Sequence, residues 1–167
     1  MSILQGLTTK CAHIVPSLRV TTTMRVCGVD VKICPAEELV WSKAFVMERE
    51  RYDGADVMHV VRGLGPDLDW QRLLVRFGEH WRVLLSHLVL YGFVYPTERH
   101  RVPRWVMDEL IARLAADVGD DLTRGKTCLG TLVSRQQYLP DIDRQGFGDG
   151  RLVEGGMTPA EIAAWTA

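Results

Sequence analysis

The sequence has no long hydrophobic run and no large excess of charge of either sign. Its longest apolar stretch, from Val83 to Val94, is interrupted by Ser86 and His87 and is too short to span a bilayer. The 20 basic and 21 acidic residues give a net charge of −1, so no overall field draws the chain toward nucleic acid or an anionic membrane. The threonine-rich beginning of the chain has no signal-peptide hydrophobic region. We therefore expect a cytoplasmic protein that does not associate with membranes.

Cysteine pairs at metal-ligand spacing are also absent. The four cysteines are Cys11, Cys27, Cys34 and Cys128. Structural zinc needs four ligands, typically offered in closely spaced pairs, so this scatter favours reduced, buried thiols and predicts no metal site. His80 and His87 lie seven residues apart with no acidic residue at the turn between them, so we expect partly buried, hydrogen-bonded histidines rather than ligands.

The length and composition of the chain suit one domain. At 167 residues, with 47% hydrophobic residues, the chain can form a single sizeable core. We expect residues 1–23 to be a poorly defined N-terminal segment and residues 24–167 to form the domain. Apolar and polar residues alternate around a glycine from Met24 to Cys34, which predicts a short hairpin or a bent strand.

Helical patterns dominate the rest of the sequence. Pro35, followed by two glutamates, predicts a helix over residues 36–51, and Asp53 can cap the next helix with its carboxylate. Further helices are predicted from Asp67 or Asp69 to residue 77, over 79–94, from residue 103, and after the capping-box sequence at 158–161. The predicted fold is therefore a mainly helical α+β domain: a short N-terminal hairpin or strands, about five helices, and a loop-rich C-terminal tail in which residues 132–142 form a strand or a short helix.

Residues 35–57 contain the densest charge cluster of the chain. Lys43, Arg49, Arg51, Asp53 and Asp56 fall around one predicted helix and its exit. By residue pattern alone, the charged run favours a solvated helical face, with Asp53 serving only as a helix cap. In the alternative interpretation, the lysine is a point charge for a triphosphate and Arg51 a fork for phosphate or for Asp56.

This segment resembles the distal half of minimal nucleotidyltransferase domains of the DNA polymerase β-like superfamily. In that family, a lysine on one helix and an Arg-x-Asp-x-x-Asp-like element after it support the nucleotide site, which here corresponds to Lys43, Arg51, Asp53 and Asp56. The register of Arg49 against that pattern is ambiguous. The resemblance looks closest to one bacterial subgroup and covers roughly residues 28 to 165. Within that range, the matching segments include residues 68–74, 80–88, 95–96 and 128–132.

The part of the family pattern that holds the catalytic metals is missing. Upstream of residue 35 there is no Gly-Ser followed by Asp-x-Asp, and the two Asp-x-Asp sequences at 67–69 and 141–143 do not follow such a turn. Asp30, between two valines, has the form of the family's third acidic residue, but one carboxylate cannot hold a metal pair. The chain thus looks like a nucleotidyltransferase without its catalytic half.

The resemblance implies transfer of a nucleoside monophosphate from an NTP with Mg²⁺. Because this chain has only the supporting half, we expect it to hold Mg²⁺ poorly and to be inactive or very feeble alone. Either the missing half was lost by truncation or degeneration, or a partner chain supplies it. A second hypothesis is a non-enzymatic helical module that binds a partner chain. A third is weak binding of nucleic acid by a basic strip formed by Arg99, Arg101 and Arg104.

Overall fold

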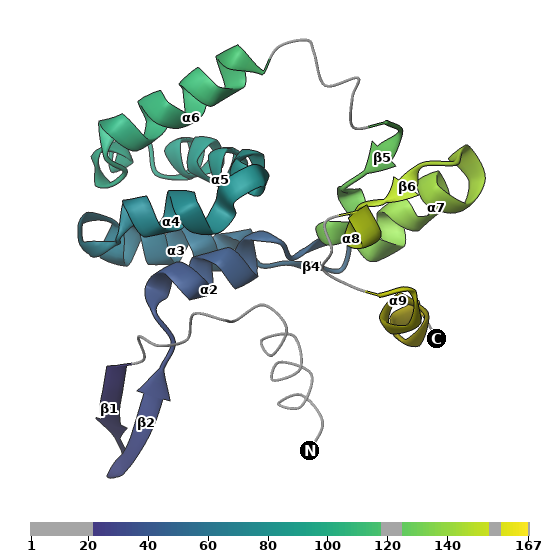
Figure 1. The fold of residues 1–167 in the computed structure, drawn as a ribbon. Helices are drawn as coiled ribbons and strands as arrows, with labels where there is room; N and C mark the ends of the chain where they lie inside the picture. Colours follow the sequence, from purple (N-terminus) through teal and green to yellow (C-terminus); the bar gives the residue numbers. More distant parts are fainter. Residues whose placement is uncertain (1–21, 118–124, 154–157, 167) are drawn as a thin grey trace. The chain divides into compact units, whose positions relative to one another are not determined.

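The computed structural model describes residues 22–117, 125–153 and 158–166. The chain divides into two compact units, residues 1–35 and residues 36–167. It is a predominantly helical α+β protein with an N-terminal hairpin, as the sequence predicts (Figure 1). The segment predicted to be poorly defined, residues 1–23, lies almost entirely outside the described residues.

The first unit contains an antiparallel hairpin of β1 (Thr22–Val26) and β2 (Val29–Ile33). Cys27 and Gly28 form its two-residue turn with φ angles of 51° and 83°, the left-handed conformation that tight hairpin turns require. Cys27 and Cys34 are exposed and Cys128 is half-buried, so the prediction of buried thiols was wrong for the described cysteines. The turn accounts for the exposure of Cys27, because a residue at the tip of a two-residue turn has few neighbours within the hairpin.

The second unit is built mainly of helices joined by short turns. Its elements in chain order are α2 (Ala36–Ala44), β3 (Met47–Glu48), β4 (Arg51–Tyr52), α3 (Gly54–Leu64), α4 (Trp70–Phe77), α5 (Trp81–Val94), α6 (Arg104–Ala116), β5 (Thr127–Cys128), α7 (Arg135–Gln145), β6 (Gly148–Asp149), α8 (Gly150–Val153) and α9 (Pro159–Thr166). Short 3-10 helices at 65–67, 78–80, 99–101 and 130–132 connect some of them.

The predicted helix over residues 36–51 ends at Ala44, so its second half was predicted wrongly. After Ala44 the chain forms a second hairpin, in which β3 and β4 pair antiparallel and the turn at residues 49–50 is the tip. The backbone N–H of Met47 donates to the carbonyl of Val133, 3.1 Å away. This bond comes from a distant segment, and helical periodicity in the local sequence gives no sign of it.

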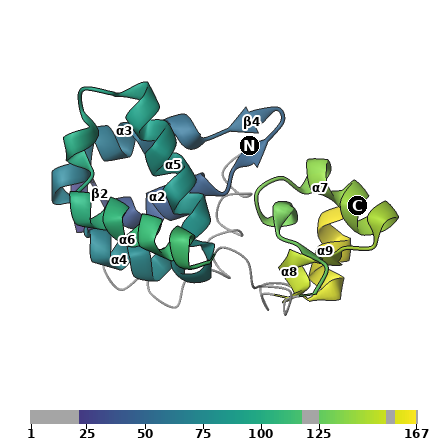
Figure 2. The same cartoon turned by 90° about the horizontal axis from the view of Figure 1, so that it is seen from above.

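The core lies among α2, α3, α4, α5 and α6, which group together in Figure 2. Helix α5 buries Leu84, Leu88 and Tyr91, which confirms the prediction that residues 79–94 contain a central helix. Asp69 caps α4 by accepting the N–H of Arg72 at 2.9 Å, as the sequence predicts. The core thus fixes the end of α2 and the start of α3, the two elements that position the candidate site.

The C-terminal part contains more regular structure than the predicted loop-rich tail. Residues 132–142, left open between strand and helix, contribute to α7, and β5 pairs in parallel with β6 on either side of it. At the start of α9, the N–H of Thr158 donates to Glu161 at 2.7 Å and the N–H of Glu161 to the Thr158 hydroxyl at 3.3 Å. This reciprocal pair confirms the predicted capping box. No helix in the described ranges has the length and apolar character that a membrane span requires.

Candidate functional site

Four of the charged residues singled out in the sequence meet in one ion-pair cluster, which we call the Lys43 cluster: Lys43, Arg51, Asp53 and Asp56. Lys43 Nζ, in the last turn of α2, lies 2.8 Å from Asp53 Oδ2 and 2.8 Å from Asp56 Oδ2. Arg51 forks onto Asp53, with Nε 3.1 Å from Oδ1 and Nη2 2.9 Å from Oδ2. The structure therefore directs the arginine fork at Asp53 rather than at Asp56.

Asp53 occupies the position before α3, yet its side chain makes no capping hydrogen bond to that helix. The prediction that its carboxylate caps the helix was wrong, because both oxygens accept from Lys43 or Arg51 instead. Its backbone N–H donates to the carbonyl of Val46 at 3.0 Å. This bond joins the two ends of the β3–β4 hairpin just before α3 begins. The β3–β4 hairpin is thus the element that brings Arg51 to Lys43.

A close contact between Tyr52 and Gly54 sets the direction of the chain at the site. A Cβ atom on Gly54 would lie 2.1 Å from the Tyr52 ring and hydroxyl, so only glycine allows this packing. The same ring stacks on the imidazole of His87 with centroids 6.3 Å apart and planes 15° apart. The aromatic ring of β4 therefore lies between the start of α3 and the central helix α5.

The electrostatics of the Lys43 cluster favour the charged forms of Lys43, Arg51 and Asp53 through shifts in the pKa of each. Hydrogen bonds from Arg51, and then from Lys43, lower the pKa of Asp53 to about 2 despite the opposing effect of burial. The bonds to Asp53 and Asp56 raise the pKa of Lys43, so its ammonium form is favoured. Two cations and two carboxylates cancel, and the cluster as a whole is neutral.

His87 lies beside the cluster and is almost completely buried, with 2% of its surface exposed. Its Nε2–H donates to the carbonyl of Ala44 at 2.9 Å, the residue after Lys43. Its Nδ1 atom is buried and has no hydrogen-bond partner among the described residues. Burial lowers the pKa of His87, and the neutral Nε2–H tautomer fits this environment. The prediction of a hydrogen-bonded histidine is confirmed for Nε2 and fails for Nδ1.

Mg²⁺ does not fit the Lys43 cluster. Lys43 and Arg51 already take the carboxylate oxygens that a hard cation would need. Within the described ranges, the side chains of His, Cys, Asp and Glu form no group of three that could hold a metal ion. We therefore assign no metal chemistry to these carboxylates.

The weaker sequence candidates lie outside the Lys43 cluster. Arg49 is 82% exposed at the tip of the β3–β4 hairpin, 3.6 Å from Glu50. Asp30 lies in the first unit, on β2, and its carboxylate is 3.9 Å from Arg25. Among the interactions of the described residues, Arg49 makes no ion pair with Lys43.

The arginines of the predicted basic strip lie close to carboxylate or carbonyl oxygens. Arg99 donates to the carbonyl of Pro96 at 2.9 Å, and Arg101 donates to Glu98 at 3.0 Å. Arg104 is 93% exposed, with Asp108 3.5 Å away. The strip is therefore a mixed-charge surface, which gives less attraction for phosphate than three unaccompanied arginines would.

Glu48 is a site-positioning residue that the sequence did not reveal. Its carboxylate accepts from the hydroxyl of Ser134 at 2.6 Å and from the N–H of Arg135 at 3.0 Å. These bonds tie β3 to the start of α7 across 86 residues of chain. No local sequence signal marks a partner at that separation.

We expect Glu48→Ala to loosen the start of α7 while leaving the helical core intact. Bonds to a charged carboxylate contribute about 1.5–3 kcal/mol each, so backbone amides in residues 130–145 should exchange faster with solvent. Hydrogen exchange measured by mass spectrometry tests this, with Glu50→Ala, an 86% exposed position at the hairpin tip, as the matched control. Equal exchange in the two variants would contradict the positioning role.

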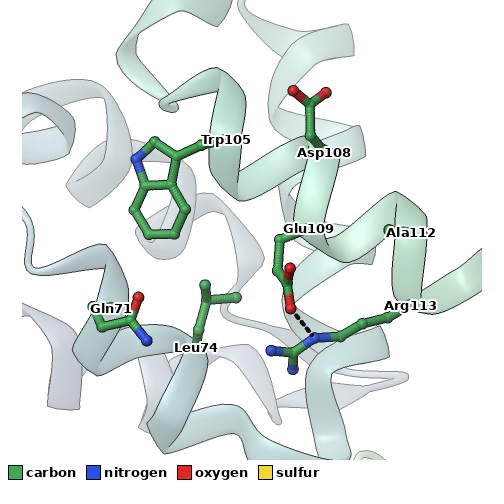
Figure 3. Close-up of a pocket in the computed structure, with 7 residues that line it drawn as sticks. All are labelled: Gln71, Leu74, Trp105, Asp108, Glu109, Ala112 and Arg113. Atoms are coloured by element: carbon green, nitrogen blue, oxygen red, sulfur yellow. Dashed lines mark hydrogen bonds and ion pairs between the residues drawn. The ribbon is translucent and has the colours of Figure 1, made fainter.

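A shallow groove of about 610 Å³ lies elsewhere, between α4 and α6 (Figure 3). Its lining residues are Gln71, Leu74, Trp105, Asp108, Glu109, Ala112 and Arg113. The close-up shows Glu109 bonded to Arg113 on the α6 side of the groove, at 2.9 Å. None of the residues of the Lys43 cluster lines it, so the hollow and the charged site are separate features.

Comparisons of the chain with models of protein families, with curated proteins and with solved structures found no match. The resemblance to nucleotidyltransferases therefore stays a prediction.

Proposed function

We propose that this chain is the supporting half of a nucleotidyltransferase-like protein and that the Lys43 cluster contacts the triphosphate of an NTP. The observation that carries the proposal is the convergence of Lys43 and Arg51 on Asp53, from a helix and a hairpin that are separate in the sequence. In this role, Asp53 and Asp56 hold the two cations in place and do not bind metal.

The donors of the cluster allow such a contact. Lys43 has three N–H donors, and Asp53 and Asp56 take two of them, so one remains for a ligand oxygen. Arg51 is 60% exposed and binds Asp53 through Nε and Nη2, which leaves Nη1 on the outer side of the guanidinium. Because the cluster is neutral, we expect modest affinity for a nucleotide from this chain alone.

The catalytic step requires groups that this sequence does not supply. We propose that a partner chain carries the carboxylates that hold two divalent ions, and that these ions supply charge neutralisation and activation of the attacking hydroxyl. This chain would contribute orientation of the triphosphate through Lys43 and Arg51. Alone, it would bind an NTP without transferring the nucleoside monophosphate.

Isothermal titration with ATP, GTP, CTP and UTP in Mg²⁺ tests the nucleotide site. We expect saturable binding of at least one nucleotide, lost in a Lys43→Ala, Arg51→Ala double variant and weakened in Arg51→Gln. The single variant keeps Lys43 on Asp53, so we expect it to fold even if the double variant does not. Arg104→Ala, at a 93% exposed arginine, is the matched control and should bind as the unaltered chain does.

Two results would overturn the nucleotide proposal. One is the absence of binding by a chain whose circular dichroism shows it folded. The other is binding that Arg51→Gln and the double variant leave unchanged, which would place the nucleotide elsewhere.

The second candidate function, a non-enzymatic module that binds a partner chain, is favoured by the exposed apolar face of α5. Phe93 is 82% exposed and Val89 is 60% exposed, although both belong to the central helix. Leu90 and Val94 on the same helix are 37% and 43% exposed. Exposed apolar side chains gathered on one element are typical of interaction surfaces.

A further inference from the structure

The hairpin of the first unit has an apolar face that is open to solvent. Met24 pairs with Val31, and Val26 pairs with Val29, so the alternation of the strands places these four side chains on one face. Their exposed fractions are 53%, 37%, 46% and 62%, respectively. A two-stranded hairpin is marginally stable in water and gains stability from further strands.

Among the described residues, no strand pairs with the outer edge of β2. In the part of the chain that the structure describes, β2 pairs with β1 alone. Val26 and Val29 close the two-residue turn and form a hydrogen-bonded pair, so every second residue of β2 directs its backbone groups toward β1. Asp30 and Lys32 therefore direct their N–H and C=O groups outward, where an unpaired edge recruits another strand.

The sequence of β2 is self-complementary about its central residue. Residues 29–33 read Val-Asp-Val-Lys-Ile, with Asp30 and Lys32 on either side of Val31. If two copies of this strand pair antiparallel with their Val31 residues opposite each other, Asp30 of each copy lies opposite Lys32 of the other. Val29 of each copy then lies opposite Ile33 of the other, on the apolar face.

We propose that β2 is a homodimer interface, in which it pairs antiparallel with β2 of a second copy in the register centred on Val31. The outward backbone groups of Asp30 and Lys32 match this register, because an opposed Asp30–Lys32 pair exchanges both backbone hydrogen bonds. A two-fold axis through the Val31 pair relates the copies, as in most homodimers. The result is a four-stranded sheet with one continuous apolar face and two opposite-charge pairs on the other.

The other edge of the hairpin offers no comparable match. An antiparallel pairing of two β1 strands centred on Met24 would place Arg25 opposite Thr23 of the second copy, without an acidic partner. Opposite charges across strands stabilise a pair, whereas like charges directly opposite destabilise it. The pattern of charge therefore selects β2 and a second copy of this chain as its occupant.

Charge reversal at the two positions tests the interface in the full chain. Asp30→Lys places two lysines opposite each other in both halves of the dimer, and Lys32→Asp places two acidic residues opposite each other. We expect each variant to dissociate at least about tenfold more readily than the unaltered chain, as measured by analytical ultracentrifugation over a concentration series. An equimolar mixture of the two variants should restore the dimer, because every cross-strand pair is then again of opposite charge.

The mixture separates this interface from a general loss of folding, since misfolded variants would not restore each other. Glu50→Lys, the same kind of change at the tip of the other hairpin, is the matched control and should leave the dimer unchanged. A chain that sediments as a monomer at every concentration overturns the proposal. So does a dimer that persists in both single variants, or a mixture that remains monomeric. These outcomes are independent of nucleotide binding, because Asp30 and Lys32 lie outside the Lys43 cluster.

Discussion

Replacing Asp149 with alanine is expected to destabilise the C-terminal part of the second unit more than any other single substitution considered for this protein. Asp149 and Arg151 form an ion pair in which each side chain is only 7% exposed, with Nη2 2.6 Å from Oδ2. Asp149 also accepts from the hydroxyl of Thr131 at 2.8 Å and from the backbone N–H of Arg151 at 3.0 Å. Removing the carboxylate leaves a buried guanidinium without its counter-charge.

An uncompensated buried charge of this kind costs about 3–5 kcal/mol. We expect Asp149→Ala to lose that much stability in denaturant unfolding, or to unfold residues 125–153 locally if that segment melts before the core. Hydrogen exchange of the α7 amides distinguishes the two cases. Asp143→Ala, which removes an exposed carboxylate from α7, is the matched control. A loss no larger than the control's would contradict a stabilising role for the pair.

A double replacement separates the charge from the packing. Asp149→Leu with Arg151→Met removes both charges, and apolar residues of similar size often replace a buried ion pair with little loss. We therefore expect the double variant to be more stable than Asp149→Ala alone. A double variant as unstable as Asp149→Ala would show that the hydrogen bonds from Thr131 and the backbone, rather than the uncompensated charge, account for the loss.

Asp53→Asn is expected to destabilise the protein by about 2 kcal/mol at neutral pH and by much less in acid. The pKa of Asp53 is about 2 in the folded protein against an ordinary value of 3.8, and each unit of difference is worth about 1.4 kcal/mol. Because the folded-state pKa is the lower one, the contribution is complete above about pH 4 and is lost as the pH falls through about 2. The Asp53 side chain is only 11% exposed, but Arg51 is 60% exposed and solvent screens its ion pair, so the expected loss lies below the full value of the pKa shift.

Denaturant unfolding at pH 7, 5 and 3 measures this effect. The difference between the unaltered chain and Asp53→Asn should be equal at pH 7 and 5 and smaller at pH 3. Asp56→Asn is the matched control: its partner is also Lys43, but Asp56 is 53% exposed, and exposed ion pairs contribute at most about 1 kcal/mol. A difference that stays constant down to pH 3 would show that the charge of Asp53 is not what stabilises the fold.

The residues of the Lys43 cluster could be selected from the sequence, but their geometry could not. The family resemblance pointed to Lys43 and Asp53, whereas the charge pattern alone favoured a solvated helical face, and the structure brings the two side chains to 2.8 Å. The sequence predicted that one continuous helix through residue 51 carries Lys43 and Arg51. In the structure the helix ends at Ala44, and a hairpin carries Arg51. That hairpin is joined to a distant segment by the bond from Met47 to Val133, a contact over more than eighty residues that local propensity does not encode.

Local signals also placed several helix boundaries correctly. Asp69 before α4 and the Thr158–Glu161 capping box before α9 act within one turn of chain, so the residues that form the bonds are neighbours in the sequence. The apolar spacing of α5 likewise identified its buried side from 3.6-residue periodicity. The buried pair of Asp149 and Arg151 has no local sequence signal, because two oppositely charged residues near a glycine usually lie in an exposed loop.

By itself, the sequence determined the mainly helical α+β class, the N-terminal hairpin and several helix starts, because periodicity, caps and turn residues act over a few positions. Only the tertiary structure decided where α2 ends, which carboxylate Arg51 binds, and which charges are buried. Those outcomes depend on contacts between segments that lie far apart in the chain. A buried charge or an unpaired backbone group needs a hydrogen-bonding partner, and only the folded chain shows which distant residue provides it.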